Sequence, residues 1–271
     1  ELLHYGLEAL PADGVVVAIS QSGESAETLR VVEHLAPRHP VVAITNDPES
    51  RLGRRGQVLL PLCAGAEAAI STKTYSNTLA LLHLLAAAVA GRDLEAECRR
   101  LEGLAADMTE ALDRREAMDG AADFLRDAAF LYFLARGPAL AAARQAALTF
   151  SEGARLPTCA LAGGSFRHGP LELAGEGFAA AVLAPAGGTW ELSTALAGQI
   201  AAAGGRVLLL TDRAPAARAG GLRIVDLPPC GEDLFPLAAC VPVELLLYRM
   251  ARDRGREAGV FQHISKVTRR E

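Results

Sequence analysis

An internal repeat constrains the fold of this chain more than any other feature of its sequence. Residues 14–47, GVVVAISQSGESAETLRVVEHLAPRHPVVAITND, align with residues 178–212, FAAAVLAPAGGTWELSTALAGQIAAAGGRVLLLTD. In both segments an apolar run leads through a short loop into a helical pattern and then into a second apolar run that ends at an aspartate. Continuous apolar strands separated by helices indicate a parallel sheet covered on both faces. Two copies of this unit predict two α/β domains and not a solenoid of short repeats.

The predicted fold is two tandem flavodoxin-like domains, each with a parallel sheet flanked by helices. We assign residues 1–92 to the first domain, 93–118 to a charged connecting helix, and 119–271 to the second domain with a C-terminal tail. The apolar stretch 79–90 suits a buried helix. The pattern predicts strands at 15–19, 41–45, 57–63 and 130–134, and helices at 26–35, 72–90, 94–118 and 140–153. The last strand and last helix have no counterpart in the first domain, so we expect that domain to lack its N-terminal strand and helix.

Composition argues against several functional classes. The 271 residues carry a net charge of -5, which offers no basic surface for nucleic acid. No apolar run approaches the ~20 residues of a membrane span, and no signal peptide is recognisable. The five cysteines are scattered without a CxxC pair, which argues against a zinc site and a disulfide framework. We therefore expect a cytoplasmic protein that uses no metal.

The loop SQSGES, residues 20–25, follows the first predicted strand and precedes a helix. Free backbone N–H groups and the positive end of a helix dipole favour a phosphate at such a place. The hydroxyls of Ser20, Ser22 and Ser25 can add donors, and Gly23 allows close backbone approach. Helix capping is the alternative role for a serine here. Three serines around one glycine at the carboxyl end of a strand favour binding.

Ser71-Thr72-Lys73 opens the long apolar helix and repeats this theme. A hydroxyl at a helix start can cap the helix or contact a ligand, so Ser71 and Thr72 are candidates for either role. Lys73 is one of only two lysines in a chain rich in arginine, and the other is Lys266. Chemistry that needs an amine does not tolerate arginine in its place, which makes both lysines candidates for a functional role.

Three further residues are candidates for acid–base chemistry. Glu152 lies near the end of an alanine-rich helix, where a partly buried carboxylate can act as a base and an exposed one is merely solvated. His168 lies in the loop SFRHGP and can exchange protons near neutral pH. Lys266 precedes the charged C-terminus in HISKVT, where a lysine is usually solvated.

Together these segments resemble the SIS (sugar isomerase) family. They are the SQSGES loop, the STK turn, the alanine-rich helix that ends near Glu152, the FRHGP loop and the terminal SKVT, and they span essentially the whole chain. The similarity is to the double-SIS branch, which includes the isomerase portion of glucosamine-6-phosphate synthase and stand-alone deaminases and deglycases. It implies two SIS domains and no cofactor.

The resemblance implies a role for each candidate residue. Glu152 would move a proton between C1 and C2 of the sugar, His168 would open the sugar ring from a neighbouring subunit, and Lys266 would meet the open-chain form. The remaining candidates would bind the substrate: Ser20, Gln21, Ser22 and Ser25 its phosphate, and Ser71, Thr72 and Ser265 its sugar. In one departure from the family pattern, Thr149 replaces a lysine one turn before the glutamate.

The expected function is that of an aldose–ketose isomerase or a deaminase. Its substrate would be an amino-sugar 6-phosphate such as glucosamine 6-phosphate, and the chain would act as a homodimer. A deglycase acting on a sugar-amine conjugate is a close variant. The alternative is a regulator that binds a phosphosugar without catalysis, for which the serine loop alone would suffice.

Overall fold

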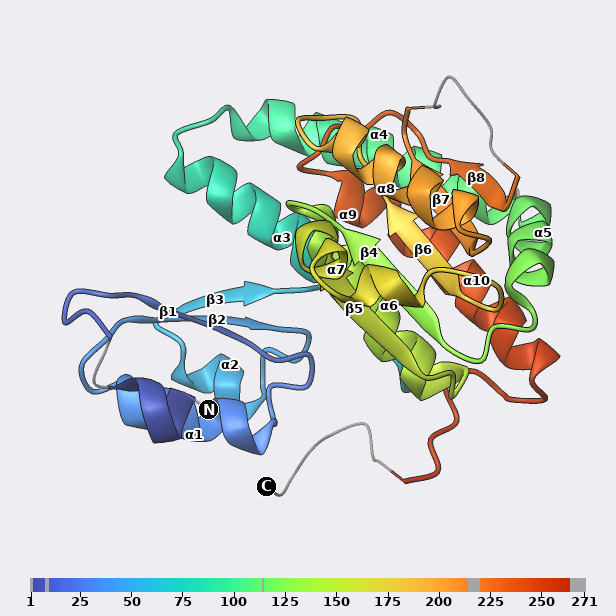
Figure 1. Cartoon of the computed structure of the whole chain (residues 1–271). Coiled ribbons are helices and arrows are strands. Elements are labelled where there is room, and N and C mark those ends of the chain that lie inside the picture. The colour runs from blue at the N-terminus through green and yellow to red at the C-terminus, as the bar shows by residue number, and fades with distance from the viewer. Residues whose placement is uncertain (1, 8–9, 114, 214–219, 264–271) are drawn as a thin grey trace. The chain divides into compact units, whose positions relative to one another are not determined.

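A computed structural model of the chain describes residues 2–7, 10–113, 115–213 and 220–263 (Figure 1). The chain forms two compact units. The first takes in the chain up to Leu85 together with the described residues from Phe261 onward, and the second runs from Ala86 to Val260. None of the described helices combines the length and the apolar character that a membrane crossing requires.

The first unit is a small parallel sheet with helices. Its elements are η1 (Leu2–Gly6), β1 (Val16–Ile19), α1 (Ala26–Leu35), β2 (Val41–Thr45), α2 (Arg51–Arg55), β3 (Val58–Pro61) and most of α3 (Lys73–Val89). The strands are parallel, in the order β1-β2-β3. Figure 1 shows α1 and α2 on one side of this sheet. There Leu29, Val32 and Leu52 pack against Ala18 and Ala43.

The opposite face of β1 corrects a prediction. The segment 15–19 was expected to be a buried strand, but Val15, Val17 and Ile19 are 60%, 42% and 41% exposed. Side chains alternate between the two faces of a strand, so these three share the face that does not pack on α1. In the sheet of the first unit β1 is also an edge strand. The described chain therefore covers only one face of β1, although its apolar run predicts burial on both faces.

The second unit contains a larger sheet. Its elements are α4 (Leu94–Asp113), α5 (Glu116–Leu125), β4 (Leu131–Ala135), α6 (Ala139–Gly153), β5 (Thr158–Ala162), α7 (Gly163–Arg167), η3 (Pro170–Leu173), β6 (Ala179–Leu183), α8 (Trp190–Ala202), β7 (Arg206–Thr211), β8 (Leu222–Asp226), α9 (Phe235–Ala238) and α10 (Cys240–Asp253). All five strands are parallel, in the order β5-β4-β6-β7-β8. The helical region predicted at 94–118 is divided between α4 and α5.

The strand order of the two units repeats, as the sequence predicts. Strands β6, β7 and β8 follow one another as β1, β2 and β3 do, and every pairing is parallel. The predicted class, α/β units with parallel sheets flanked by helices, is confirmed. The second unit adds β4 beside β6, and also β5, which the pattern analysis missed. Strand β5 is half-buried along its whole length, and its run of apolar residues, 159–162, is too short to distinguish a strand from a helix. Strand β8 was not predicted either.

Helix α3 is less buried than its composition predicts. Of the stretch 79–90 only Ala87 is buried, residues up to Leu85 are half-buried, and Val89 is 83% exposed. Apolar residues occupy all sides of this helix, and a helix of that kind cannot bury them all against one neighbour. The expectation of a buried helix was therefore wrong for the chain taken alone.

Candidate functional site

The serine loop, residues 20–25, lies at the carboxyl end of β1. The Ser20 N–H donates to the Ile44 carbonyl at 3.0 Å, which continues the pairing of β1 with β2. The Gln21 carbonyl accepts hydrogen bonds from the Asn46 N–H at 3.0 Å and from the Thr45 hydroxyl at 3.2 Å. Hydrogen bonds from the end of β2, the neighbouring strand, and from the residue after it therefore fix the position of the loop.

Gly23 is required by the packing of this loop. Its φ is 65°, in the left-handed region that favours glycine. A Cβ at this position would lie 1.9 Å from the Ser50 hydroxyl. That hydroxyl donates to the Asp47 carbonyl at 2.6 Å and accepts the Gly53 N–H at 3.2 Å. From the sequence, Gly23 was expected to let the backbone approach a ligand closely. The structure shows that glycine is also needed here for packing against Ser50, whether or not a ligand binds.

The start of α1 is the part of the loop that can receive an anion. Its first helical bond runs from the Leu29 N–H to the Ser25 carbonyl at 3.0 Å, which leaves the amides of residues 26–28 without a helical partner. The Ser25 hydroxyl makes no capping bond. Within the described part of the chain the hydroxyl of Ser20, a residue 9% exposed, likewise has no hydrogen-bond partner. These donors point to an anion site at the positive end of the helix dipole.

Local capping explains only one of the three serines. The Ser22 hydroxyl accepts the Glu24 N–H at 3.2 Å. The Glu24 carboxylate itself lies toward α2, because it accepts the Arg51 N–H at 2.7 Å and pairs with the Arg51 guanidinium at 3.5 Å. The negative charge of Glu24 is therefore balanced by Arg51 of α2.

A carboxylate of the chain occupies the start of α3. Glu67 accepts the N–H of Thr72 at 2.9 Å and that of Thr74 at 3.0 Å, and the Thr74 hydroxyl donates to it at 2.6 Å. The Lys73 ammonium donates to the Ala66 carbonyl. Sequence reasoning placed Ser71 and Thr72 at this turn but missed Glu67. The sequence signal for this cap is a glutamate a few residues before a helix start that is rich in hydroxyl side chains.

Glu152 lies near the end of α6 in the second unit. It is half-buried, and burial raises the pKa of its carboxyl group above the ordinary value. Within the described residues its carboxylate has no hydrogen bond and no ion pair. Thr149, one turn earlier, is buried, and its hydroxyl donates within the helix to the carbonyls of Gln145 and Ala146. A partly desolvated carboxylate without a partner suits a proton acceptor better than a solvated helix end does.

His168 ends the short helix α7 in the same unit. Its N–H donates to the Ser165 carbonyl at 3.2 Å, and its side chain is exposed. The next residue, Gly169, has a φ of 139°, which turns the chain sharply toward η3. The imidazole is thus carried on a tight turn and is accessible. The remaining predicted site residues, Ser265 and Lys266, lie outside the described residues.

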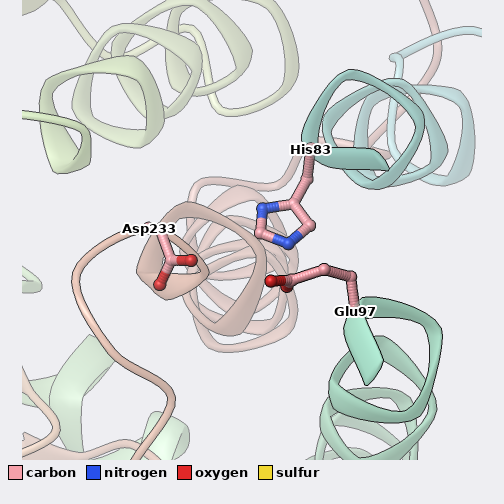
Figure 2. Close-up of side chains that lie close together, drawn as sticks. All are labelled: His83, Glu97 and Asp233. Atoms are coloured by element: carbon pink, nitrogen blue, oxygen red, sulfur yellow. The ribbon is translucent and has the colours of Figure 1, made fainter. Parts of the chain in front are cut away.

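An acidic pair in the second unit is part of an ion-pair network. Figure 2 shows the carboxyl groups of Glu97 and Asp233 turned toward each other, and their oxygens lie within 4.8 Å. The Arg100 guanidinium bonds Glu97 at 2.7 Å and Asp233 at 2.9 and 3.0 Å, and Arg92 pairs with Glu97 at 3.2 Å. Because arginine already balances these carboxylates, the pair serves structure, tying α4 to the segment before α9.

The sequence of the first unit matches a known family. Residues 1–88 align with the family model described as the SIS domain. The first unit is therefore an SIS domain. The family resemblance is thus confirmed for this part of the chain, which contains the serine loop and the Ser71–Thr72 turn.

A curated relative extends the similarity along the chain. The glutamine–fructose-6-phosphate aminotransferase (isomerizing) of Zymomonas mobilis is 30% identical over 264 residues, which cover 93% of this chain and 44% of the relative. The chain thus spans less than half the length of this relative. The aligned region takes in most of both units, and it is similar to the isomerising part of such enzymes.

Two solved structures share the fold. The C-terminal domain of glucosamine-fructose-6-phosphate aminotransferase from Francisella tularensis superposes with a TM-score of 0.80 at 24% identity, covering 93% of this chain and 76% of that one. Glucosamine-6-phosphate deaminase from Thermotoga maritima gives a TM-score of 0.77 at 22% identity, covering 96% and 78%. At these identities the comparison establishes the fold alone.

Proposed function

We propose that the serine loop binds the phosphate group of a phosphorylated amino sugar. The observation that carries this proposal is the start of α1, where backbone amides and the hydroxyls of Ser20 and Ser25 remain available. The start of α3 is a poorer phosphate site, because the carboxylate of Glu67 already fills it. With phosphate at the serine loop, the turn that carries Ser71 and Thr72 would contact the sugar.

The reaction we propose is the isomerisation or deamination of an amino-sugar 6-phosphate. Relatives of the chain are named for fructose 6-phosphate and glucosamine 6-phosphate, and the candidate residues suit that chemistry. His168 would protonate and open the ring, and Glu152 would take the proton from C2 and return it to C1 through an enediol or enamine. Lys266 would contact the open-chain carbonyl. The base returns one proton for each proton it removes, and that proton exchanges with solvent on the Glu152 carboxyl, so isomerisation needs no co-reactant. Deamination in addition consumes water and releases ammonia.

The second unit is, in this proposal, a second copy of the same domain. The parallel strands β6-β7-β8 repeat the order β1-β2-β3. The loop after β6, PAGGTW, lacks the serines of its counterpart. The second unit would therefore contribute Glu152 and His168 and would bind no phosphate of its own.

Proton exchange in heavy water tests the function. The chain is incubated with glucosamine 6-phosphate and, separately, with fructose 6-phosphate plus ammonia, and the C1 and C2 protons are followed by NMR. We expect deuterium to enter at these carbons, and the Glu152→Gln variant to abolish the exchange while still binding the sugar phosphate. Glu176→Gln, which changes an exposed glutamate of the same unit, is the matched control and should leave exchange unchanged.

Two results would count against this proposal. Exchange that persists in Glu152→Gln would remove that residue from the role of base. Binding of several hexose and amino-hexose phosphates without any exchange would point to a phosphosugar-binding regulator instead.

A further inference from the structure

The loop between β3 and α3 is held in place by side chains from outside it. The Asn46 amide binds it twice, with Nδ2 donating to the Gly65 carbonyl at 2.8 Å and Oδ1 accepting the Ala64 N–H at 2.9 Å. Asn77 of α3 donates to the Leu62 carbonyl at 2.8 Å. Together these bonds fix the first half of the loop on the residues around it.

Glu67 fixes the second half of the loop between β3 and α3. Its carboxylate accepts three hydrogen bonds from Thr72 and Thr74, and Thr74 is only 2% exposed. A carboxylate at a helix start satisfies free amides and interacts favourably with the helix dipole. The turn that carries Ser71 and Thr72 is therefore set by a charged group of the chain itself.

Asn46 also bonds to the serine loop. Its own N–H donates to the Gln21 carbonyl at 3.0 Å. The same carbonyl accepts the hydroxyl of Thr45, a fully buried residue. One asparagine thus bonds to both loops at the carboxyl edge of the sheet, with its backbone to one and its side chain to the other.

We propose that Asn46 and Glu67 are positioning residues that set the Ser71–Thr72 turn relative to the serine loop. Glu67 has a second effect: as a resident anion it keeps phosphate away from the start of α3. A sugar phosphate would then bind in one orientation, with phosphate at α1 and sugar hydroxyls at α3. This inference rests on the proposed function, since it concerns the same binding site.

Calorimetric titration with two probes tests the positioning role of Asn46 and Glu67. Inorganic phosphate reports on the serine loop alone, and glucosamine 6-phosphate reports on both loops. Glu67→Ala and Asn46→Ala should each weaken glucosamine 6-phosphate binding by about tenfold, which corresponds to the loss of one or two hydrogen bonds. In Glu67→Ala, phosphate binding at the serine loop should stay within about twofold of the unmodified chain, and a second phosphate should now bind at the start of α3, where the amides have lost their carboxylate.

Two further variants sharpen the test. Glu67→Gln keeps an acceptor for both amides, so it should retain glucosamine 6-phosphate affinity within about threefold. Glu49→Ala removes an exposed carboxylate that pairs only with Arg54 in the described structure. This control should change neither affinity.

Equal loss of both probes in Glu67→Ala would overturn the inference, because it would mean that Glu67 supports the whole unit. Unchanged affinity for the sugar phosphate would overturn it as well. If the unmodified chain binds neither probe, the proposed function fails, and amide hydrogen exchange decides the positioning claim by itself. Faster exchange at Thr72 and Thr74 in Glu67→Ala, with the serine loop unchanged, supports the claim, and unchanged exchange at both amides overturns it.

Discussion

At the scale of single residues, the surroundings of Glu152 decide what its carboxyl group can do. The sequence left open whether this glutamate is a solvated helix end or a base. In the fold it is half-buried, and desolvation raises its pKa. Burial disfavours the charged form of a carboxyl group and so makes the carboxylate a better proton acceptor once it is ionised.

The raised pKa predicts the acid limb of the activity profile. A base must be ionised, so exchange activity should fall as the pH drops through the pKa of Glu152, and this limb should lie above the ordinary value of 4.5. The same shift slightly disfavours the folded state as the pH rises through this pKa, because the protonated form is the one that burial favours. The measurement is kcat/KM for proton exchange against pH. A limb at or below 4.5 would contradict the assignment.

A pair of glycine variants tests the packing of the serine loop. Gly23→Ala should destabilise the first unit by about 2 kcal/mol or more, because its φ is 65° and the added Cβ would overlap the side chain of Ser50. Gly103→Ala, in the interior of α4 with open space at its Cβ, should stabilise by about 0.5–1 kcal/mol. Urea unfolding measures both. Equal effects of the two variants would mean that Gly23 has no special conformational role.

At the scale of elements, long-range ion pairing connects segments that the sequence pattern treats separately. Arg100 of α4 bonds Asp233, which lies just before α9 and 133 residues away from Arg100 along the chain. The side chain of Glu97 is only 9% exposed and is shared by two arginines. Periodicity predicted the helical region that contains α4, but it contains no information about which loop that helix meets.

Removing Arg100 should therefore destabilise the second unit. Arg100→Met removes one of the arginines that balance the buried Glu97 carboxylate and breaks the bonds to Asp233, and we expect a loss of about 1–2 kcal/mol. The neighbouring Arg99→Met breaks only an exposed pair with Glu95 at 3.8 Å, and should change stability by less than about 0.5 kcal/mol. Thermal unfolding of both variants, at low and high salt, checks the contrast. A larger loss for Arg99→Met would contradict the buried role of Glu97.

At the scale of the whole molecule, two features favour association with a second copy. The apolar helix α3 stays largely half-buried in the single chain, and the His168 side chain is exposed. Surface of this kind is typical of a subunit contact. We therefore propose a homodimer in which His168 serves the site of the neighbouring subunit.

Mixing two inactive variants tests this arrangement. If His168 acts across the interface, a heterodimer of Glu152→Gln and His168→Ala retains one complete site, and activity should return on mixing. If both residues act within one subunit, every site in the mixture stays defective. Light scattering of the unmixed variants provides the control for assembly. A monomeric chain that is active would contradict the shared site.

By itself, the sequence determined the parallel α/β class, the repeat and the position of the serine loop after a strand. Those properties follow from local periodicity and turn chemistry, which neighbouring residues control. Tertiary structure alone decided that β1 is exposed on one face, that Glu152 is desolvated and that Arg100 bonds Asp233. Burial and long-range partners depend on segments that are distant along the chain, so no local pattern could predict them.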